Sequence, residues 1–169
     1  MNQKMAKVEF SIEDRQWQKV KFVDLVRTSC QTTFNYLGVD NRFHISVLGC
    51  NNRRISELNL LFRKLKEPTN ILSWPSKERS PEKAGLCPEI PIFKKGFDND
   101  LGDLAFAYSY CAKEANFLGR LLSDHLIHLT VHGVLHLLGF DHLSDKDAEL
   151  MEKVETNILN TLGLEDPYK

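Results

Sequence analysis

The chain lacks the features that mark secreted, membrane-spanning and disulfide-built proteins. No stretch of about 18 apolar residues occurs, so no membrane span is expected. Residues 1–9 contain no apolar run of the kind found in a signal peptide. The cysteines are scattered, without a Cys-x-x-Cys pair, at Cys30, Cys50, Cys87 and Cys111. Scattered thiols without a secretion signal indicate a reducing, cytoplasmic location.

The chain also lacks an excess of charge of either sign. It contains 22 lysines and arginines against 23 aspartates and glutamates, a formal net charge of -1. No overall basic field therefore indicates a nucleic-acid partner, and any such binding must depend on a local patch. Hydrophobic residues make up 42% and charged residues 27%, which is typical of a globular protein.

Hydrophobic periodicity predicts strands and helices that alternate along one domain. Alternating apolar residues predict strands at residues 8–12, 44–48, 69–74 and 101–107. Helical spacing predicts helices at 17–37, after a cap at Asn52, at 111–117, at 123–138, and after a capping box of Ser144 and Asp147. This order predicts an α+β fold, a small mixed β-sheet packed with about five helices, in a single domain spanning residues 1–169.

The same periodicity predicts which side chains the helices bury. The second helix is expected to bury Ile55, Leu58, Phe62 and Leu65, and the last helix Met151, Val154, Ile158 and Leu162. Residues 76–100, rich in proline, glycine and charge, predict a long loop. Loops of this length are usually functional or mobile.

Histidines are concentrated in one short segment, where five of the six lie between residues 125 and 142. His132 and His136 are four residues apart, so on a helix they lie on one face, about 6 Å apart along the axis. Gly139 lets the chain turn out of the helix and bring back His142. Three protein ligands with a fourth position for water are the usual form of a catalytic zinc site. We therefore predict one zinc ion per chain, at the end of a helix, on His132, His136 and His142.

The segment reads H-G-V-L-H-L-L-G-F-D-H. It matches the metzincin spacing H-E-x-x-H-x-x-G-x-x-H at every metal-ligand and glycine position. Gly133 replaces the glutamate that acts as the general base of peptide hydrolysis. Glycine cannot take a proton from zinc-bound water. The segment therefore keeps the ligand spacing of a zinc peptidase but lacks its base.

Other interpretations of these residues remain open. The histidines could be ordinary core or surface residues, although three at ligand spacing beside a turn glycine favour a metal site. A closed structural zinc would need a fourth ligand, for which Asp141 is the nearest candidate. Asp141 could instead orient a histidine or contact substrate.

Two further histidines share the helical stripe of His132 and His136. His125 lies about 10 Å along the helix axis from His132, too far to share the ion, so we expect a structural role. His128 lies one turn away. It is expected either to hydrogen-bond a ligand or touch substrate, or to be a satisfied core histidine.

A local excess of basic residues lies between positions 53 and 66. The basic residues are Arg53, Arg54, Arg63, Lys64 and Lys66, and Glu57 and Glu67 are the acidic ones. Such an excess can follow a nucleic-acid backbone or simply form a solvated helix face. Arg63 suits two phosphate oxygens because its guanidinium is a planar fork, unless it pairs with a neighbouring glutamate. Trp74 and Phe140 are candidates either for base stacking or for the core.

Three blocks of the chain resemble the YbeY family, bacterial single-strand endoribonucleases of ribosomal RNA maturation. Residues 132–142 fit the family signature H-G-x-L-H-L-x-G-[YF]-D-H. Residues 58–75 read L-N-L-L-F-R-K-L-K-E-P-T-N-I-L-S-W-P and resemble its L-N-x-x-[YF]-R-x-x-x-x-P-T-[DN]-[VI]-L-S-[FW]-P block. Leu101-Gly102-Asp103 is similar to its L-G-D-I strand. The chain departs from the family at Asn70, where Asp is usual, at Trp74, where Phe is usual, and in its longer loop at 76–100.

The resemblance implies a site and a cellular role. It implies one zinc on the three histidines, with His136 and an essential Arg63 as the catalytic residues. It further implies action on single-stranded ribosomal RNA at the ribosome or its small subunit, in 16S 3′ end maturation and ribosome quality control, with no membrane or DNA partner. Two alternatives are a zinc-dependent peptidase or amidase, and a non-catalytic ribosome-assembly factor with a stabilising zinc. Whether water or the RNA 2′-hydroxyl attacks is left open by the sequence.

Overall fold

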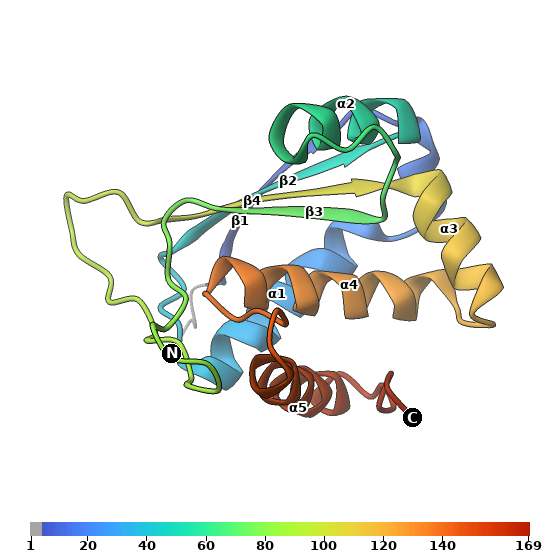
Figure 1. Cartoon of the computed structure of the whole chain (residues 1–169). Coiled ribbons are helices and arrows are strands. Elements are labelled where there is room, and N and C mark those ends of the chain that lie inside the picture. Colours follow the sequence, from blue (N-terminus) through green and yellow to red (C-terminus); the bar gives the residue numbers. More distant parts are fainter. Residues whose placement is uncertain (1–4) are drawn as a thin grey trace.

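A computed structural model describes residues 5–169, in which four strands form one sheet surrounded by five α-helices (Figure 1). In chain order the elements are β1 (Lys7–Ile12), α1 (Phe22–Leu37), β2 (His44–Cys50), α2 (Asn52–Arg63), β3 (Ile71–Pro75), β4 (Asp100–Ala107), α3 (Tyr108–Phe117), α4 (Leu122–Leu137) and α5 (Asp145–Thr161). A short 3-10 helix, Arg15–Lys19, precedes α1. The predicted α+β fold with a small mixed sheet is confirmed.

The strand order in the sheet is β1-β2-β4-β3. β1, β2 and β4 run parallel, whereas β3 pairs antiparallel with β4 and forms one edge. Only one side of β3 is therefore paired within the sheet. Its other side remains free to line a cleft, and the site described below lies along it.

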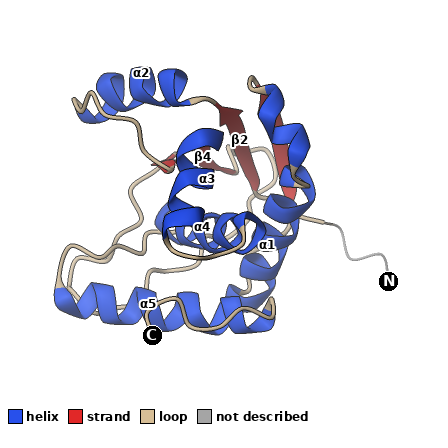
Figure 2. Ribbon diagram, turned by 90° about the vertical axis from the view of Figure 1, so that its right-hand side faces the viewer, coloured by secondary structure: helices blue, strands red, loops and turns tan. Residues whose placement is uncertain are grey.

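The helices are distributed unequally over the two faces of the sheet. α1 and α4 lie against one face with α5 beyond them, and α2 lies on the other face (Figures 1 and 2). The larger apolar core fills the space between the sheet and α1, α4 and α5. A smaller core under α2 consists of Cys50, Ile55, Leu72, Ala105 and Ala107. Within residues 5–169, no helix combines the length and apolar composition needed to cross a membrane.

The first helix begins later than its periodicity predicts, at Phe22 instead of residue 17. Trp17 lies in the preceding 3-10 helix, 2% exposed, and its Nε1 donates a hydrogen bond to the Cys50 carbonyl at 3.1 Å. Its ring stacks on Phe22 with centroids 4.0 Å apart. The hydrogen bond to Cys50 holds the Trp17 indole at the end of β2, so the turn that contains Trp17 is not part of α1.

The predicted inner face of α2 is wrong at its C-terminal half, because Phe62 is 56% and Leu65 is 53% exposed. The inward line instead continues from Ile55 to Asn59, whose Nδ2 donates to the Glu67 carbonyl at 2.8 Å. The helix cap is also Asn51 and not Asn52, since the Asn51 side chain accepts the Arg54 N–H.

The predicted boundaries around the histidine segment are confirmed within about one residue, as expected for strongly periodic segments. α4 ends at Leu137, and Gly139 follows with a φ of 98°. Ser144 caps α5 by accepting the Asp147 N–H, as the capping box predicts. α3 begins at Tyr108, three residues before its predicted start.

Candidate metal centre

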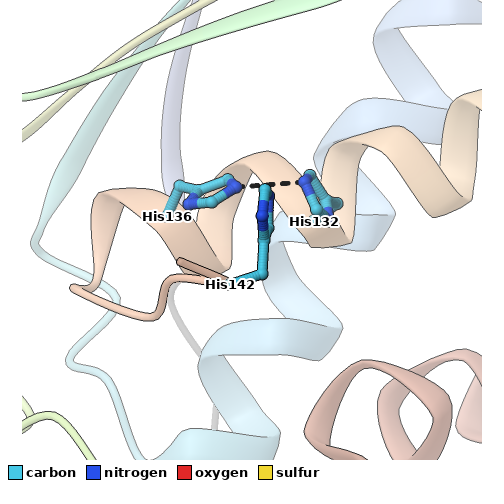
Figure 3. Close-up of side chains that lie close together, drawn as sticks. All are labelled: His132, His136 and His142. Carbon is cyan, nitrogen blue, oxygen red and sulfur yellow. Dashed lines mark hydrogen bonds between the residues drawn. The ribbon is translucent and has the colours of Figure 1, made fainter. Parts of the chain in front are cut away.

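The three predicted ligands converge at the C-terminal end of α4. His132 and His136 lie side by side on the helix, and the ring of His142 reaches them from the segment after it (Figure 3). Each offers one ring nitrogen, and these atoms all lie within 4.8 Å of one another. Their spacing in the sequence therefore corresponds to a group that could hold one ion.

The turn that returns His142 to the helix depends on Gly139. Its φ of 98° lies in the left-handed region, and a Cβ there would sit 2.4 Å from the Arg79 carbonyl oxygen. Phe140 then anchors the turn with its side chain only 3% exposed. This burial makes Phe140 a core residue, so the alternative of base stacking is wrong for it.

Hydrogen bonds orient two of the three histidines toward a common point. His136 Nδ1 lies 3.0 Å from the Phe140 carbonyl, and His132 Nδ1 lies 3.1 Å from Oε2 of Glu155. Both acceptors require the proton on Nδ1, which leaves each Nε2 with a free lone pair. These two Nε2 atoms face each other at 3.0 Å (Figure 3). Two lone pairs at this distance repel unless a cation lies between them, so the histidines fit a bound metal.

The electrostatic setting favours the neutral form of His136, the form of imidazole that binds metal. Burial lowers the pKa of His136 to about 4, and the nearby His132 and His142 rings contribute to the lowering. Three imidazoles with room for a further ligand are typical of catalytic zinc sites, although imidazole also suits other transition metals.

Glu155 is a residue of the site that the sequence analysis missed. It lies on α5 with its side chain fully buried, and it pairs with both His128 and His132. Burial alone would raise the pKa of this carboxyl, but its hydrogen bonds with His128 and His132, together with the electrostatic effect of these two rings, lower it to about 2. The sequence offers one sign of this role, because Glu155 is a charged residue on the predicted apolar stripe between Met151 and Ile158.

The other two histidines of the stripe differ from the ligands. His128 takes the predicted position next to the metal group, but its partner is Glu155 and not a ligand ring. His125 is 3% exposed, and its Nε2 lies 2.7 Å from Oε2 of Glu114 on α3. This pairing is consistent with the structural role predicted for His125.

Asp141 accepts a hydrogen bond from the backbone N–H of His142, 2.7 Å from its Oδ1. It therefore stabilises the turn that carries the third histidine. It also lines the cleft described next, so contact with substrate stays a prediction.

A cleft of about 750 Å³ connects the three histidines to the end of α2. The free side of β3 forms one wall, His128 and Tyr168 line the same cavity, and Arg63 and Phe62 lie at its far end. Arg63 thus lines the same cavity as the candidate metal centre, although about 70 residues lie between Arg63 and His132 in the sequence.

Arg63 is exposed at the last turn of α2 and, within residues 5–169, has no carboxylate within salt-bridge distance. The alternative of pairing with Glu57 is wrong, because Glu57 contacts Arg53 at 3.4 Å and Arg54 at 3.5 Å. These two arginines are therefore partly neutralised. The basic residues that line the cleft are Arg63, Arg79 and Arg120, of which Arg63 belongs to α2.

The long loop at residues 76–100 is joined to the neighbouring elements by hydrogen bonds between side chains and the backbone. The Arg79 guanidinium donates to the Leu137 carbonyl at the end of α4, at 3.1 Å, and to the Asp100 carbonyl at 3.3 Å. Further along, the Gly85 N–H donates to Oδ1 of Asp147 at the start of α5, at 2.8 Å. Residues 78–80 of this loop line the cleft, and Arg79 supports the Gly139 turn.

Gly133 has a packing role that the motif comparison did not predict. It faces β3 and β4, where an added Cβ would lie 2.8 Å from Ile71 Cδ1 and 2.9 Å from Leu104 Cδ2. The residue at this position therefore contacts the sheet, and its small size lets α4 approach closely. A glutamate here would first have to displace core side chains.

Three histidines that could hold a metal ion line one cleft with Arg63, which has no acidic partner among residues 5–169, and such an arrangement suits metal-dependent hydrolysis of phosphate esters. Comparison with known proteins agrees with this class. The family described as Endoribonuclease YbeY matches residues 7–163, and the chain belongs to that family.

Relatives with this description cover nearly the whole chain. Endoribonuclease YbeY of Jannaschia sp. is 44% identical over 162 residues, which are 95% of this chain and 99% of the relative. That of Cereibacter sphaeroides is 45% identical over 163 residues, 95% of this chain and 98% of the relative. A solution structure from Thermotoga maritima shares the fold, with a TM-score of 0.54 and 18% identity, covering 96% of this chain and 99% of that one.

Proposed function

We propose that this chain is a zinc-dependent endoribonuclease that cleaves single-stranded RNA. Membership of the endoribonuclease family makes it a hydrolase acting on RNA. The observation that carries the finer proposal is the cleft in which the ligand nitrogens of His132, His136 and His142 converge within 4.8 Å and which Arg63 also lines.

The residues of the cleft have distinct roles in this proposal. Zinc, when bound, supplies a Lewis acid that polarises a phosphoryl oxygen and lowers the pKa of bound water. His132, His136 and His142 hold it through neutral nitrogens, two of them oriented by Glu155 and the Phe140 carbonyl. Arg63 places its two-pronged guanidinium against phosphate oxygens and stabilises charge that develops during cleavage.

We further propose ribosomal RNA as the substrate, in maturation of the 16S 3′ end and in ribosome quality control in the cytoplasm. The partners are single-stranded RNA and the ribosome or its small subunit, with no DNA or membrane partner. The family resemblance supports this role, and the basic residues that follow α2 would suit an RNA backbone. The single domain of residues 1–169 is proposed to contain the whole site.

The two alternatives receive less support. A zinc peptidase lacks its base, and the Gly133 position that would carry it packs against Ile71 and Leu104. A non-catalytic factor with a stabilising zinc would need a closed site. The three histidines instead line an open cleft of about 750 Å³.

Cleavage assays with purified protein test the proposal. Single-stranded RNA should be cut, duplex RNA of the same sequence and casein should not, and a chelator should abolish cutting until zinc is restored. Chelator-sensitive turnover of casein with intact RNA would replace the nuclease by the peptidase alternative. No cutting of either substrate by fully zinc-loaded protein would favour the non-catalytic factor.

A further inference from the structure

We propose that Glu155 is a positioning residue that holds the metal ligand His132 in its metal-binding tautomer and supplies negative charge to the metal centre. This inference rests on the proposed function, because it requires that the three histidines bind a metal. It adds a residue from α5 to a site otherwise built from α4 and the segment after it.

The first argument is burial. Glu155 has no exposed surface, although it lies on a helix whose neighbouring inward residues, Met151 and Ile158, are apolar. A buried carboxylate is costly unless it is paired and hydrogen-bonded. Its two oxygens contact different histidines of α4, Oε2 at 3.1 Å from His132 Nδ1 and Oε1 against His128 Nε2.

The second argument is the tautomer of His132. An ionised carboxylate can only accept hydrogen bonds, so His132 must keep its proton on Nδ1 and present Nε2 to the centre. Carboxylates that hold histidines in this way fix the ring orientation and make the ligand nitrogen more basic. A metal dication on three neutral imidazoles also leaves positive charge in a partly buried site, which the Glu155 carboxylate offsets.

A second histidine–carboxylate pair on the same helix provides a comparison. His125 Nε2 lies 2.7 Å from Oε2 of Glu114, so this pair has similar chemistry. His125 is not among the three converging histidines. Glu114 therefore resembles Glu155 in chemistry but is not coupled to the metal, and Glu114→Gln is a matched control.

The test is the zinc dissociation constant of Glu155→Gln, measured by chelator competition. The amide keeps one neutral acceptor oxygen, so at best His132 loses its charged partner, and at worst it faces an N–H group and moves its proton to Nε2. We expect zinc affinity to fall about 10- to 100-fold. Glu114→Gln should leave zinc affinity unchanged, and both variants should be compared for thermal stability in the metal-free state.

The outcomes separate this inference from the proposed function. If wild-type protein binds no zinc, the proposed function fails. If wild-type protein binds zinc and Glu155→Gln binds it equally well, with or without a loss of metal-free stability, Glu155 is only structural and the inference is overturned. Should the variant fail to fold, ¹⁵N NMR of the histidine rings in metal-free wild-type protein decides, because bound zinc would itself fix the tautomer. Protonated Nδ1 on His132 supports the inference, and protonated Nε2 contradicts it.

Discussion

At one end of the cleft, side chains are held by hydrogen bonds within the protein, whereas at the other end they are exposed. His132 is hydrogen-bonded to Glu155 and His136 to the Phe140 carbonyl. Gly139 allows the turn that leads to His142. Arg63 and Phe62 instead project from the last turn of α2, both exposed, and Arg63 has no acidic partner among residues 5–169.

This difference indicates that the two ends of the cleft have different functions. A metal site must hold its ligands rigidly, because a small displacement lowers both affinity and activity. A flexible single-stranded polymer is better met by exposed groups that adapt to it, at the cost of ordering them on binding. The histidine end would then control metal binding, and the α2 end RNA binding and charge stabilisation.

The largest effect expected at the histidine end comes from His136→Ala. His136 is one of the three histidines whose ring nitrogens converge, and its Nδ1 lies 3.0 Å from the Phe140 carbonyl, so its loss leaves two of the three nitrogens. Metal analysis should show zinc falling from about one equivalent to a small fraction, and RNA cleavage should be lost with it. His125→Ala, on the same helix, should keep its zinc. Full zinc occupancy in His136→Ala would refute the ligand assignment.

Arg63→Ala should separate the two ends of the cleft. Loss of one charge-assisted contact to a transition state costs about 3 kcal/mol, or about a hundredfold in rate. Zinc content and thermal stability should remain near wild type, because Arg63 makes no ion pair within the described residues and lies outside the metal group. Arg63→Lys should recover little, since an ammonium lacks the planar fork.

The result is read from kcat/KM on single-stranded RNA, with Lys64→Ala as the neighbouring charge control. We expect Lys64→Ala to lose less kcat/KM than Arg63→Ala. Lys64 directly follows α2 and has a left-handed backbone conformation. Normal cleavage by zinc-loaded Arg63→Ala would contradict a catalytic role for Arg63 and weaken the nuclease proposal.

Gly133→Ala probes the rigidity of the histidine end without touching a ligand. Its new Cβ would lie 2.8 Å from Ile71 Cδ1 and 2.9 Å from Leu104 Cδ2. Overpacking of this kind typically costs about 1–3 kcal/mol of unfolding free energy. Denaturant unfolding of the metal-free protein should show the loss, and Gly133→Glu should lose more. A stable Gly133→Glu protein would contradict the packing role of this glycine. New peptidase activity in that protein would show that only the missing general base separates this chain from a zinc peptidase.

The sequence predicted the histidine end better than the α2 end, for physical reasons. Ligand spacing of four residues and a glycine turn are local properties, so His132, His136, His142 and the ends of α4 could be placed without the fold. Glu155 reaches the site from another helix, and only tertiary packing reveals its partners. At α2, periodicity predicted a buried Phe62, but the helix extends beyond the packed region, and Asn59 takes the inward line to bind the Glu67 carbonyl.

The exposure of Phe62 leads to the smallest effect, at the adaptable end of the cleft. Its ring is 56% exposed, lies 5.0 Å from the Trp74 ring by centroids, and lines the same cavity as Arg63. An exposed ring beside an arginine that is proposed to bind phosphate can stack on an unpaired base, which typically contributes about 1–3 kcal/mol. Phe62→Ala should therefore weaken binding of single-stranded RNA by about tenfold at unchanged zinc content, the lower part of that range.

Two controls determine whether this loss is due to stacking. Leu61→Ala removes an equally exposed side chain, 62% exposed, from the same helix turn and should change RNA affinity little. Phe62→Trp should retain affinity, because a larger ring still offers a face to a base. Binding is best measured with zinc-free protein, so that the RNA stays intact and the metal makes no contribution. If Phe62→Ala and Leu61→Ala bind RNA equally well, the aromatic ring has no special role, and basic side chains alone account for RNA binding at this end.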